Sequence, residues 1–426
     1  MGAYDIVAVR GRRVWDSRGR PTVEAEVRLS GGGFGRAIAP AGASTGSGEA
    51  VDRRDGGAAF GGMDVTGAVA AVDADLRAVI LGLDARDQAA VDHAMIAADG
   101  SPNRGRLGAN ALVAVSMATA WAAADQAKEP LWRMLGGPDA ARMPLPEIQI
   151  FGGGAHAGRR VDVQDFMIVC PGAASFAQAL DWTAEVYRAA GKIMAERGLL
   201  MGVADEGGFW PAFETNDAAL DALTLAIERA GYRPVDQVAI ALDIASSEFG
   251  KDGRYRLALE DRELSSEEMG DLIAGWVGRY PILSVEDPLA EDDWDGMAAL
   301  TGRIGAEVQI VGDDFLVTDA ERVGRAAAAG AANTVLLKPN QRGTLTETLE
   351  AWEAAKAAGF GAIVSARSGE TEDVTIIHLA VGWGVPQFKV GSFTRSERMA
   401  KWNEAIRIEE ALGPAATFAG RTALRG

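Results

Sequence analysis

The chain has 426 residues, of which 48% are hydrophobic, which is enough apolar material for a large core or for two folded domains. Its 60 acidic and 42 basic side chains give a formal net charge of −18, which opposes non-specific binding to nucleic acid or to an anionic membrane surface. The single cysteine, Cys170, excludes an intramolecular disulfide, and its place at the end of an apolar run predicts a packed thiol.

The N-terminus shows neither a secretory signal pattern nor a myristoylation motif. The most apolar long segment, 109–127, is interrupted by Asn110, Ser116 and Asp125, which indicates a buried helix rather than a membrane span. We therefore expect a cytoplasmic protein.

The first part of the chain predicts a small sheet followed by helices. Residues 22–29 alternate apolar and polar side chains, the period of a half-buried antiparallel strand. Apolar residues at helical spacing from Val69 to Ile80, and a run of small residues over 108–127, predict two core helices. The Pro144-Leu145-Pro146 segment then marks a boundary, so we expect an N-terminal α+β domain over 1–135.

The second part, 143–426, predicts a barrel of alternating strands and helices. Short and almost wholly apolar runs, separated by Ala-rich helical segments, are typical of parallel strands that are buried on both faces. Their spacing of roughly 25 residues matches one strand plus one crossover helix. The runs are 238–242, 282–285, 308–312, 334–337, 362–364 and 385–389.

Charged residues close four successive strands of this predicted barrel. Asp243, Glu286 and Asp313 follow three of the runs, and Lys338 follows the fourth. Each acid alone is explained as a helix N-cap, but the carboxyl ends of barrel strands all face the active site. Three carboxylates suit Mg²⁺, and a lysine beside a bound cation is prepared to act as a base. This combination favours removal of a proton alpha to a carboxylate.

Four motifs resemble the enolase (phosphopyruvate hydratase) family, and the similarity runs essentially end to end. They are Asp205-Glu206-Gly207-Gly208, Ser246-Ser247-Glu248-Phe249, Ser284-Val285-Glu286-Asp287-Pro288 and Ser368-Gly369-Glu370-Thr371-Glu372-Asp373. The resemblance implies an α/β fold in which a small N-terminal α+β domain with a mobile loop caps an enolase-type (β/α)8 barrel. It also implies a homodimer, two Mg²⁺ sites and a small phosphorylated carboxylate as substrate.

The resemblance also implies roles for individual residues. Lys338 would be the base, and Glu206 the acid that assists departure of the leaving group, with His156, Gln164 and Asp165 beside it. Arg367 and Ser368 would bind phosphate and Lys389 the substrate carboxylate. Asp243, Glu286 and Asp313 would hold one Mg²⁺, and Ser44, in the Gly-rich loop 40–46, would help to bind the second.

Three positions depart from the family pattern. Ala366 stands where enolases carry His, Asp165 where they carry Glu, and Gly152 where they carry Asn. The first two changes predict extra space on the leaving-group side of the pocket. His93 and His378 fall on no family motif, and we interpret them as structural or surface residues.

Arginines near the predicted pocket favour a larger and more anionic substrate. Arg159 and Arg160 follow His156, and Arg342 follows Lys338. We therefore expect a specialised enolase-like activity, carboxyphosphonoenolpyruvate synthase of phosphonate and phosphinate natural-product pathways, with a nucleotide-activated phosphonoformate as a partner substrate. It would take the proton from C2 and lose a group from C3. The alternatives are an ordinary phosphopyruvate hydratase of glycolysis and a non-catalytic binding protein on the same fold.

Overall fold

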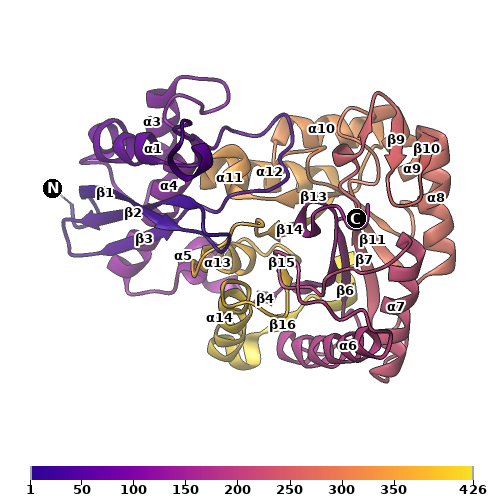
Figure 1. Ribbon diagram of the computed structural model, residues 1–426. Coiled ribbons are helices and arrows are strands. Elements are labelled where there is room, and N and C mark those ends of the chain that lie inside the picture. The colour runs from indigo at the N-terminus through magenta and orange to yellow at the C-terminus, as the bar shows by residue number, and fades with distance from the viewer. Residues whose placement is uncertain (1, 425–426) are drawn as a thin grey trace.

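The computed structural model describes residues 2–424, and its N-terminal part is a three-stranded antiparallel sheet with helices on one face (Figure 1). The strands are adjacent in chain order. They are β1 (Ile6–Trp15), β2 (Pro21–Leu29) and β3 (Phe34–Ile38). The helices are α1 (Thr66–Ala71), α2 (Arg77–Ile80), α3 (Gln88–Asp99), α4 (Ala109–Ala127) and α5 (Leu131–Gly136), with short helical turns η1 (Ala59–Gly62), η2 (Val72–Leu76) and η3 (Gly137–Asp139).

Helix α4 fills the N-terminal core because its small side chains allow close packing on the sheet. It lies against β2 and β3, and a Cβ at Gly35 would meet the Ala118 carbonyl oxygen at 1.9 Å. The predicted helix over 69–80 is α1, η2 and α2 in succession. Its residues Leu76 and Ile80 are buried, but Val79 lies on the surface. Val69 is half-buried and packs against the same core, so Val79 is the predicted core residue that lies outside it.

The second part is a closed eight-stranded barrel, as expected. In spatial order its strands are β11 (Ile282–Glu286), β12 (Gln309–Gly312), β13 (Thr334–Leu337), β14 (Gly361–Ser365), β15 (Gln387–Ser392), β5 (Leu145–Gly152), β6 (Asp165–Val169) and β7 (Ala239–Asp243). The six predicted runs correspond to six of these strands, and each pairs in parallel with its neighbours among the six.

Strand β6 is the one departure from an all-parallel barrel, since it runs antiparallel to both β5 and β7. The connection from β5 to β6, residues 153–164, contains only the short helical turn η4 (Gly154–Ala157). Without a crossover helix the chain returns in the opposite direction. The connection therefore stays at the end of the barrel where β5 finishes.

Helices surround the barrel, and several begin with a side-chain cap. Ser175, Ser265 and Thr344 each accept a hydrogen bond from the backbone N–H three residues on. The helices are α6 (Phe176–Glu196), α7 (Asn216–Arg229), α8 (Ser266–Arg279), α9 (Trp294–Ile304), α10 (Ala320–Ala329), α11 (Pro339–Arg342), α12 (Leu345–Ala358), α13 (Thr375–Gly382) and α14 (Ser396–Leu412).

Minor elements lie at the two ends of the barrel. A three-stranded sheet follows β7, and a two-stranded sheet brings the C-terminal segment beside the start of the barrel. These strands are β8 (Gly250–Lys251), β9 (Arg254–Leu257), β10 (Arg262–Ser265), β4 (Arg142–Met143) and β16 (Thr417–Phe418), and the remaining short helical turns are η5 (Ser246–Glu248), η6 (Gly413–Ala415) and η7 (Gly420–Leu424).

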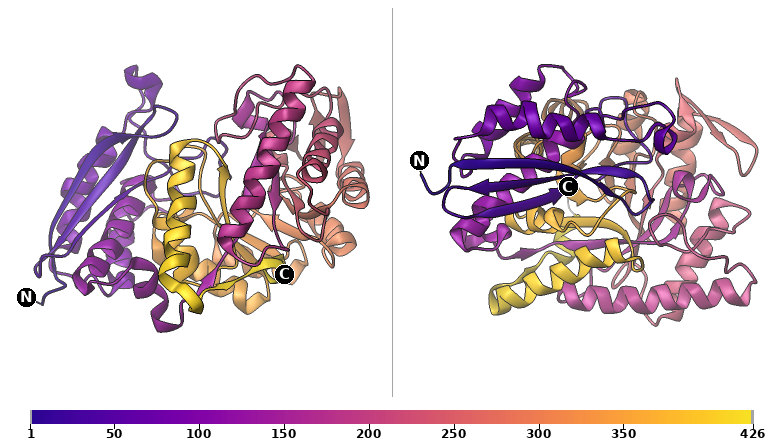
Figure 2. Two further views of the ribbon diagram at one scale, coloured as in Figure 1. Left: turned by 90° about the horizontal axis from the view of Figure 1, so that it is seen from below. Right: turned by 60° about the vertical axis from the view of Figure 1, so that its left-hand side comes forward.

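The N-terminal part forms a lobe beside the barrel and shares a core with it (Figure 2). Leu345 of α12 and Leu379 of α13 are buried within the apolar cluster of the N-terminal part. Among residues 2–424, none of the helices combines the length and the apolar character that a membrane crossing requires.

Candidate active site

The four predicted strand-end residues converge on one end of the barrel. Asp243 ends β7 and Glu286 ends β11, while Asp313 directly follows β12 and Lys338 directly follows β13. Asp243, Asp313 and Lys338 line a cavity of about 390 Å³ that includes space open to solvent. The adjacent, parallel strands bring these residues together, as the sequence predicts.

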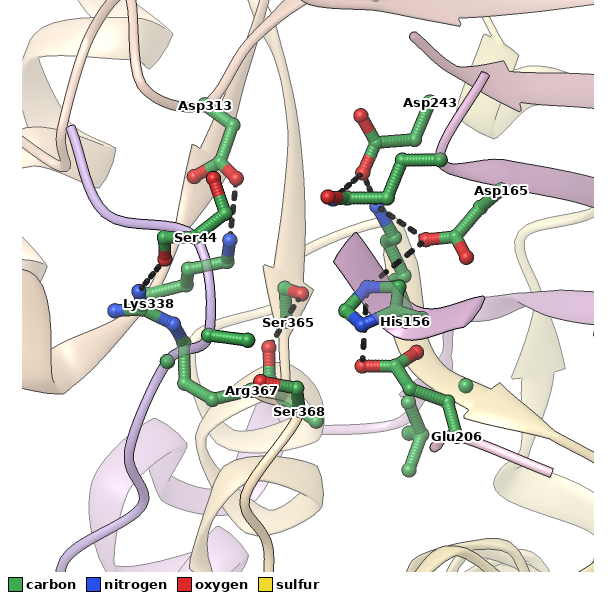
Figure 3. Close-up of a pocket in the computed structure, with 17 residues that line it drawn as sticks. Ser44, His156, Asp165, Glu206, Asp243, Asp313, Lys338, Ser365, Arg367 and Ser368 are labelled. Atoms are coloured by element: carbon green, nitrogen blue, oxygen red, sulfur yellow. Dashed lines mark hydrogen bonds and ion pairs between the residues drawn. The ribbon is translucent and has the colours of Figure 1, made fainter. Parts of the chain in front are cut away.

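The polar residues of the cavity form two groups that face each other (Figure 3). One group is Asp313 and Lys338, with Ser44 and Arg367 beside them. The opposite group consists of His156, Asp165, Glu206 and Asp243, and Ser365 and Ser368 lie between the two groups. A substrate in the cavity would therefore have a lysine on one side and a set of carboxyls on the other.

Two lysines balance the charge of the strand-end carboxylates. The Lys338 ammonium contacts Asp313, and Lys389 Nζ lies 2.8 Å from Asp243 Oδ2 and 2.7 Å from Glu286 Oε2. Burial opposes the charged form of Lys338, but the Asp313 carboxylate outweighs it and raises the lysine's pKa. Asp243 and Glu286 likewise raise the pKa of Lys389 in spite of its burial. Both lysines are therefore ammonium ions in this arrangement.

The carboxylates fit a hard divalent cation. The Glu286 Oε1 atom is buried and has no hydrogen-bond partner within residues 2–424. A buried oxygen without a partner is stabilised when it binds a cation or a proton. Burial and the nearby Asp243 raise the pKa of Glu286 well above its usual value. Oxygen donors without thiols are the set that Mg²⁺ prefers.

The predicted ligands Asp243, Glu286 and Asp313 do not form one compact cluster of oxygen atoms in this structure. Lys389 lies between Asp243 and Glu286. Among residues 2–424, two sets have possible ligand atoms within 4.8 Å of one another: Asp287, Asp313 and Asp314, and separately His156, Asp165 and Glu206. Asp287 accepts the backbone N–H groups of Asp313 and Asp314, at 2.9 and 2.7 Å, and so fixes the turn after β12.

On the opposite side, one histidine lies between two buried carboxyls. His156 Nε2 is 3.9 Å from Asp165 Oδ2 and 3.9 Å from Glu206 Oε1. Burial raises the pKa of Asp165 to about 6. Burial acts in the same sense on Glu206, but Arg398 and His156 outweigh it and lower the pKa of Glu206. Asp165 therefore holds a proton more readily than Glu206, and His156 contacts both.

Arg367 anchors the segment that carries Ser44. Its guanidinium donates to Glu49 Oε2 at 2.9 Å and to the Ser44 carbonyl at 2.9 Å. Burial opposes the charged form, but Glu49 outweighs it and raises the pKa of Arg367. Ser44 Oγ lies 3.4 Å from Asp314 Oδ2, so the loop is folded over the cavity.

Comparisons with known proteins show the family to which this chain belongs. The family model "Enolase, N-terminal domain" matches residues 6–135, and "Enolase, C-terminal TIM barrel domain" matches residues 140–426. The chain belongs to the enolase family. One curated relative, an enolase of Rubrobacter xylanophilus (strain DSM 9941 / JCM 11954 / NBRC 16129 / PRD-1), is 51% identical over 417 residues, which are 98% of this chain and 97% of the relative.

The expectation of a specialised synthase is wrong, because the chain is too similar to an enolase. An enolase-family chain that shares 51% of its residues with a protein named enolase, over 98% of its length, is related to an ordinary enolase. The role expected in phosphonate and antibiotic biosynthesis, with its nucleotide-activated phosphonoformate, is supported neither by the two family models nor by the relative from Rubrobacter xylanophilus.

The arginines behind that expectation lie outside the cavity lining of this enolase-family chain. Arg159 is largely exposed and pairs with Glu248 at 2.8 Å. Arg342 pairs with Asp319 and Glu347, at 2.7 and 3.5 Å. Both acids lie at helix N-termini, where negative charge is favoured, and they attract the guanidinium away from the cavity. Arg160 is half-buried and lines no part of the cavity.

Two of the departures from the family pattern have local explanations. A Cβ at Gly152 would lie 2.7 Å from the Ala204 Cβ and 3.1 Å from Gln149 Nε2, so glycine is needed there. The Gln149 amide donates to Asp165 and accepts the Gly208 N–H at 2.8 Å. Gln149 thereby fixes the Asp165 side chain relative to the turn that carries Glu206.

Sequence reasoning missed several polar residues of the site. They are Glu49, Gln149, Asp314, Gln341 and Arg398. Asp314 stands directly beside the predicted ligand Asp313 and could have been included. The others carry no local signal, because tertiary contacts alone bring them to the cavity. His93 is exposed, as expected for a surface residue, and His378 is buried in α13, as expected for a structural one.

Proposed function

We propose that this protein is a phosphopyruvate hydratase, which converts 2-phosphoglycerate to phosphoenolpyruvate and water. The observation that carries the proposal is the placement of Lys338 and of the Glu206 group on opposite faces of one cavity. Loss of a C2 proton and of a C3 hydroxyl needs a base at one carbon and an acid at the other. The name of the relative from Rubrobacter xylanophilus supports the same reaction.

We assign the base to Lys338. The Lys338 amine would first take the proton from C2, which leaves the electron pair of that C–H bond shared between C2 and the adjoining carboxylate. That pair would then form the C2–C3 double bond when the C3–O bond breaks. The Lys389 ammonium faces the substrate carboxylate and stabilises its charge. When Asp243, Glu286 and Asp313 hold Mg²⁺, the cation supplies positive charge that offsets both the substrate's charge and the carboxylates that keep Lys338 protonated.

The acid side would protonate the departing hydroxyl so that it leaves as water. Glu206 is the assigned donor. Because Asp165 holds a proton more readily than Glu206, Asp165 would supply that proton through His156, which lies 3.9 Å from both carboxyls. Gln164 donates to Asp243 Oδ2 at 3.2 Å and so connects this group to the proposed metal ligands. Arg367 and Ser368 would bind the phosphate, since guanidinium groups bind phosphate oxygens in pairs. Ser44 would contribute to a second Mg²⁺ site.

A direct assay tests the proposal. Purified protein with Mg²⁺ and 2-phosphoglycerate should produce the ultraviolet absorbance of phosphoenolpyruvate, with a kcat in the usual enzyme range of about 1–10³ s⁻¹. EDTA should abolish the signal and Mg²⁺ should restore it. A well-folded, Mg²⁺-loaded sample that forms no phosphoenolpyruvate would contradict the proposed function.

We also propose a homodimer, on the basis of the family resemblance. Sedimentation equilibrium should then give twice the chain mass of 44.5 kDa. A mass equal to one chain at micromolar concentration would reject this assembly.

A further inference from the structure

The turn between β12 and α10 holds two strained residues. Val317 and Thr318 have φ values of 45° and 54°. Both side chains are β-branched and fully buried, and such residues rarely adopt the left-handed region. A backbone of this kind persists only where surrounding contacts impose it, and it is concentrated at functional sites.

The strained turn places the Thr318 hydroxyl beneath the strand that ends at Lys338. Thr318 Oγ1 accepts the Lys338 backbone N–H at 2.9 Å and donates to Gln341 Oε1 at 2.5 Å. Gln341 Nε2 donates in turn to Asp313 Oδ1 at 2.8 Å. The other oxygen of Asp313 contacts the Lys338 ammonium. These contacts form a closed ring that returns to Lys338.

We infer that Thr318 and Gln341 are positioning residues that fix the reactive amine of Lys338. The inference rests on the proposed function, in which Lys338 is the base. A lysine amine lies at the end of a flexible four-carbon chain, and proton transfer requires it within hydrogen-bond reach of the substrate. The ring holds the lysine at both ends, through its backbone N–H and through Asp313. Thr318 and Gln341 are fully buried, so no solvent competes for these bonds.

The same ring extends to the loop that carries Ser44. Gln341 Nε2 lies 3.3 Å from Glu49 Oε1, and the Gln341 carbonyl accepts the Ala50 N–H at 2.7 Å. Val317 packs against the loop, because a Cβ at Gly46 would come within 2.7 Å of Val317 Cγ1. This one turn therefore positions both Lys338 and the loop that carries Ser44.

Replacement of the hydroxyl alone tests the inference. Thr318→Val keeps the β-branched shape and removes the hydroxyl, while Thr318→Ser keeps it. The matched control is Thr348→Val, since Thr348 is equally buried and bonds only the Thr344 carbonyl, at 2.7 Å. We expect Thr318→Val to lower kcat at least about 10-fold with KM for 2-phosphoglycerate within about twofold, because a displaced base affects chemistry rather than binding. Thr318→Ser should recover most of kcat, and the control should match the wild type.

Equal kcat values for Thr318→Val and Thr348→Val would overturn the inference. If Thr318→Val fails to fold, Gln341→Met removes the same ring and gives the same comparison. A wild-type protein without activity on 2-phosphoglycerate would reject the proposed function separately. In that event crystal structures decide: displacement of the Lys338 amine from Asp313 in Thr318→Val supports positioning, and an unchanged amine refutes it.

Discussion

Ala366 lines the cavity where the family pattern carries histidine, and its methyl group can donate no proton. On the acid side, Glu206, Asp165 and His156 remain. For an ordinary hydratase that tolerates the change, we expect Ala366→His to alter kcat for 2-phosphoglycerate by less than about threefold, well below the 10²–10⁴-fold typical of an essential acid–base group. Steady-state assays of both proteins at saturating Mg²⁺ measure this change in kcat. A gain of two orders of magnitude would instead show that the reaction needs a histidine there.

Glu147 is a buried carboxyl inside the barrel that the proposed chemistry does not use. Burial raises its pKa from 4.5 to about 7, although Lys389 acts in the opposite sense. For an acid whose folded pKa is raised, the stabilising contribution is full below the unfolded pKa, about 4.5, and is lost as the pH rises through the folded pKa, about 7.

We therefore expect Glu147→Gln to be more stable than the wild type at pH 8 and equally stable near pH 4.5. The upper limit of the difference is on the order of 3 kcal/mol, since each pKa unit corresponds to about 1.4 kcal/mol. Urea unfolding of both proteins in EDTA at the two pH values measures it. Equal stabilities at pH 8 would mean that Glu147 titrates normally.

At the scale of elements, the loop over residues 40–50 is held against the turn after β12. A Cβ at Gly46 would meet Val317 Cγ1 at 2.7 Å and the Asp314 Cα at 3.1 Å. Gly46→Ala should therefore displace the loop and lower kcat/KM about 10-fold, while the free energy of unfolding changes by no more than about 0.5 kcal/mol. Gly270→Ala in α8 is the control, because nothing lies within 4 Å of its Cβ position. Equal kcat/KM values for the two variants would show that the position of this loop does not affect catalysis.

The sequence predicted the elements whose signals are local. The parallel barrel strands from β7 to β15 were predicted because continuous apolar runs mark strands buried on both faces. Helix α4 was predicted from its small-residue run. The reversal of β6 was not, since nothing in its apolar residues specifies direction. The ion pairs of Arg342 with Asp319 and Glu347 could not be predicted either, because only the fold brings those two helix N-termini near it.

At the scale of the whole molecule, the N-terminal lobe completes the cavity of the barrel. Gly42, Ala43 and Ser44 line it, and Arg18 donates to Ser368 Oγ at 3.1 Å. Trp121 of α4 donates to Thr375 at 2.8 Å, which joins the lobe to the barrel. Three cations, Lys338, Arg367 and Lys389, line the cavity among its carboxyls and would contact an anionic substrate, although the net charge of the chain is −18.

Proton exchange at C2 tests the central claim most directly, that Lys338 is the base and the Glu206 group the acid across the cavity. With C2-deuterated 2-phosphoglycerate, NMR follows deuterium washout while absorbance follows phosphoenolpyruvate. We predict that Glu206→Gln lowers product formation by about 10²–10⁴-fold yet keeps washout, whereas Lys338→Met loses both. Lys356→Met, at an exposed lysine, should match the wild type. Washout that persists in Lys338→Met would contradict the account.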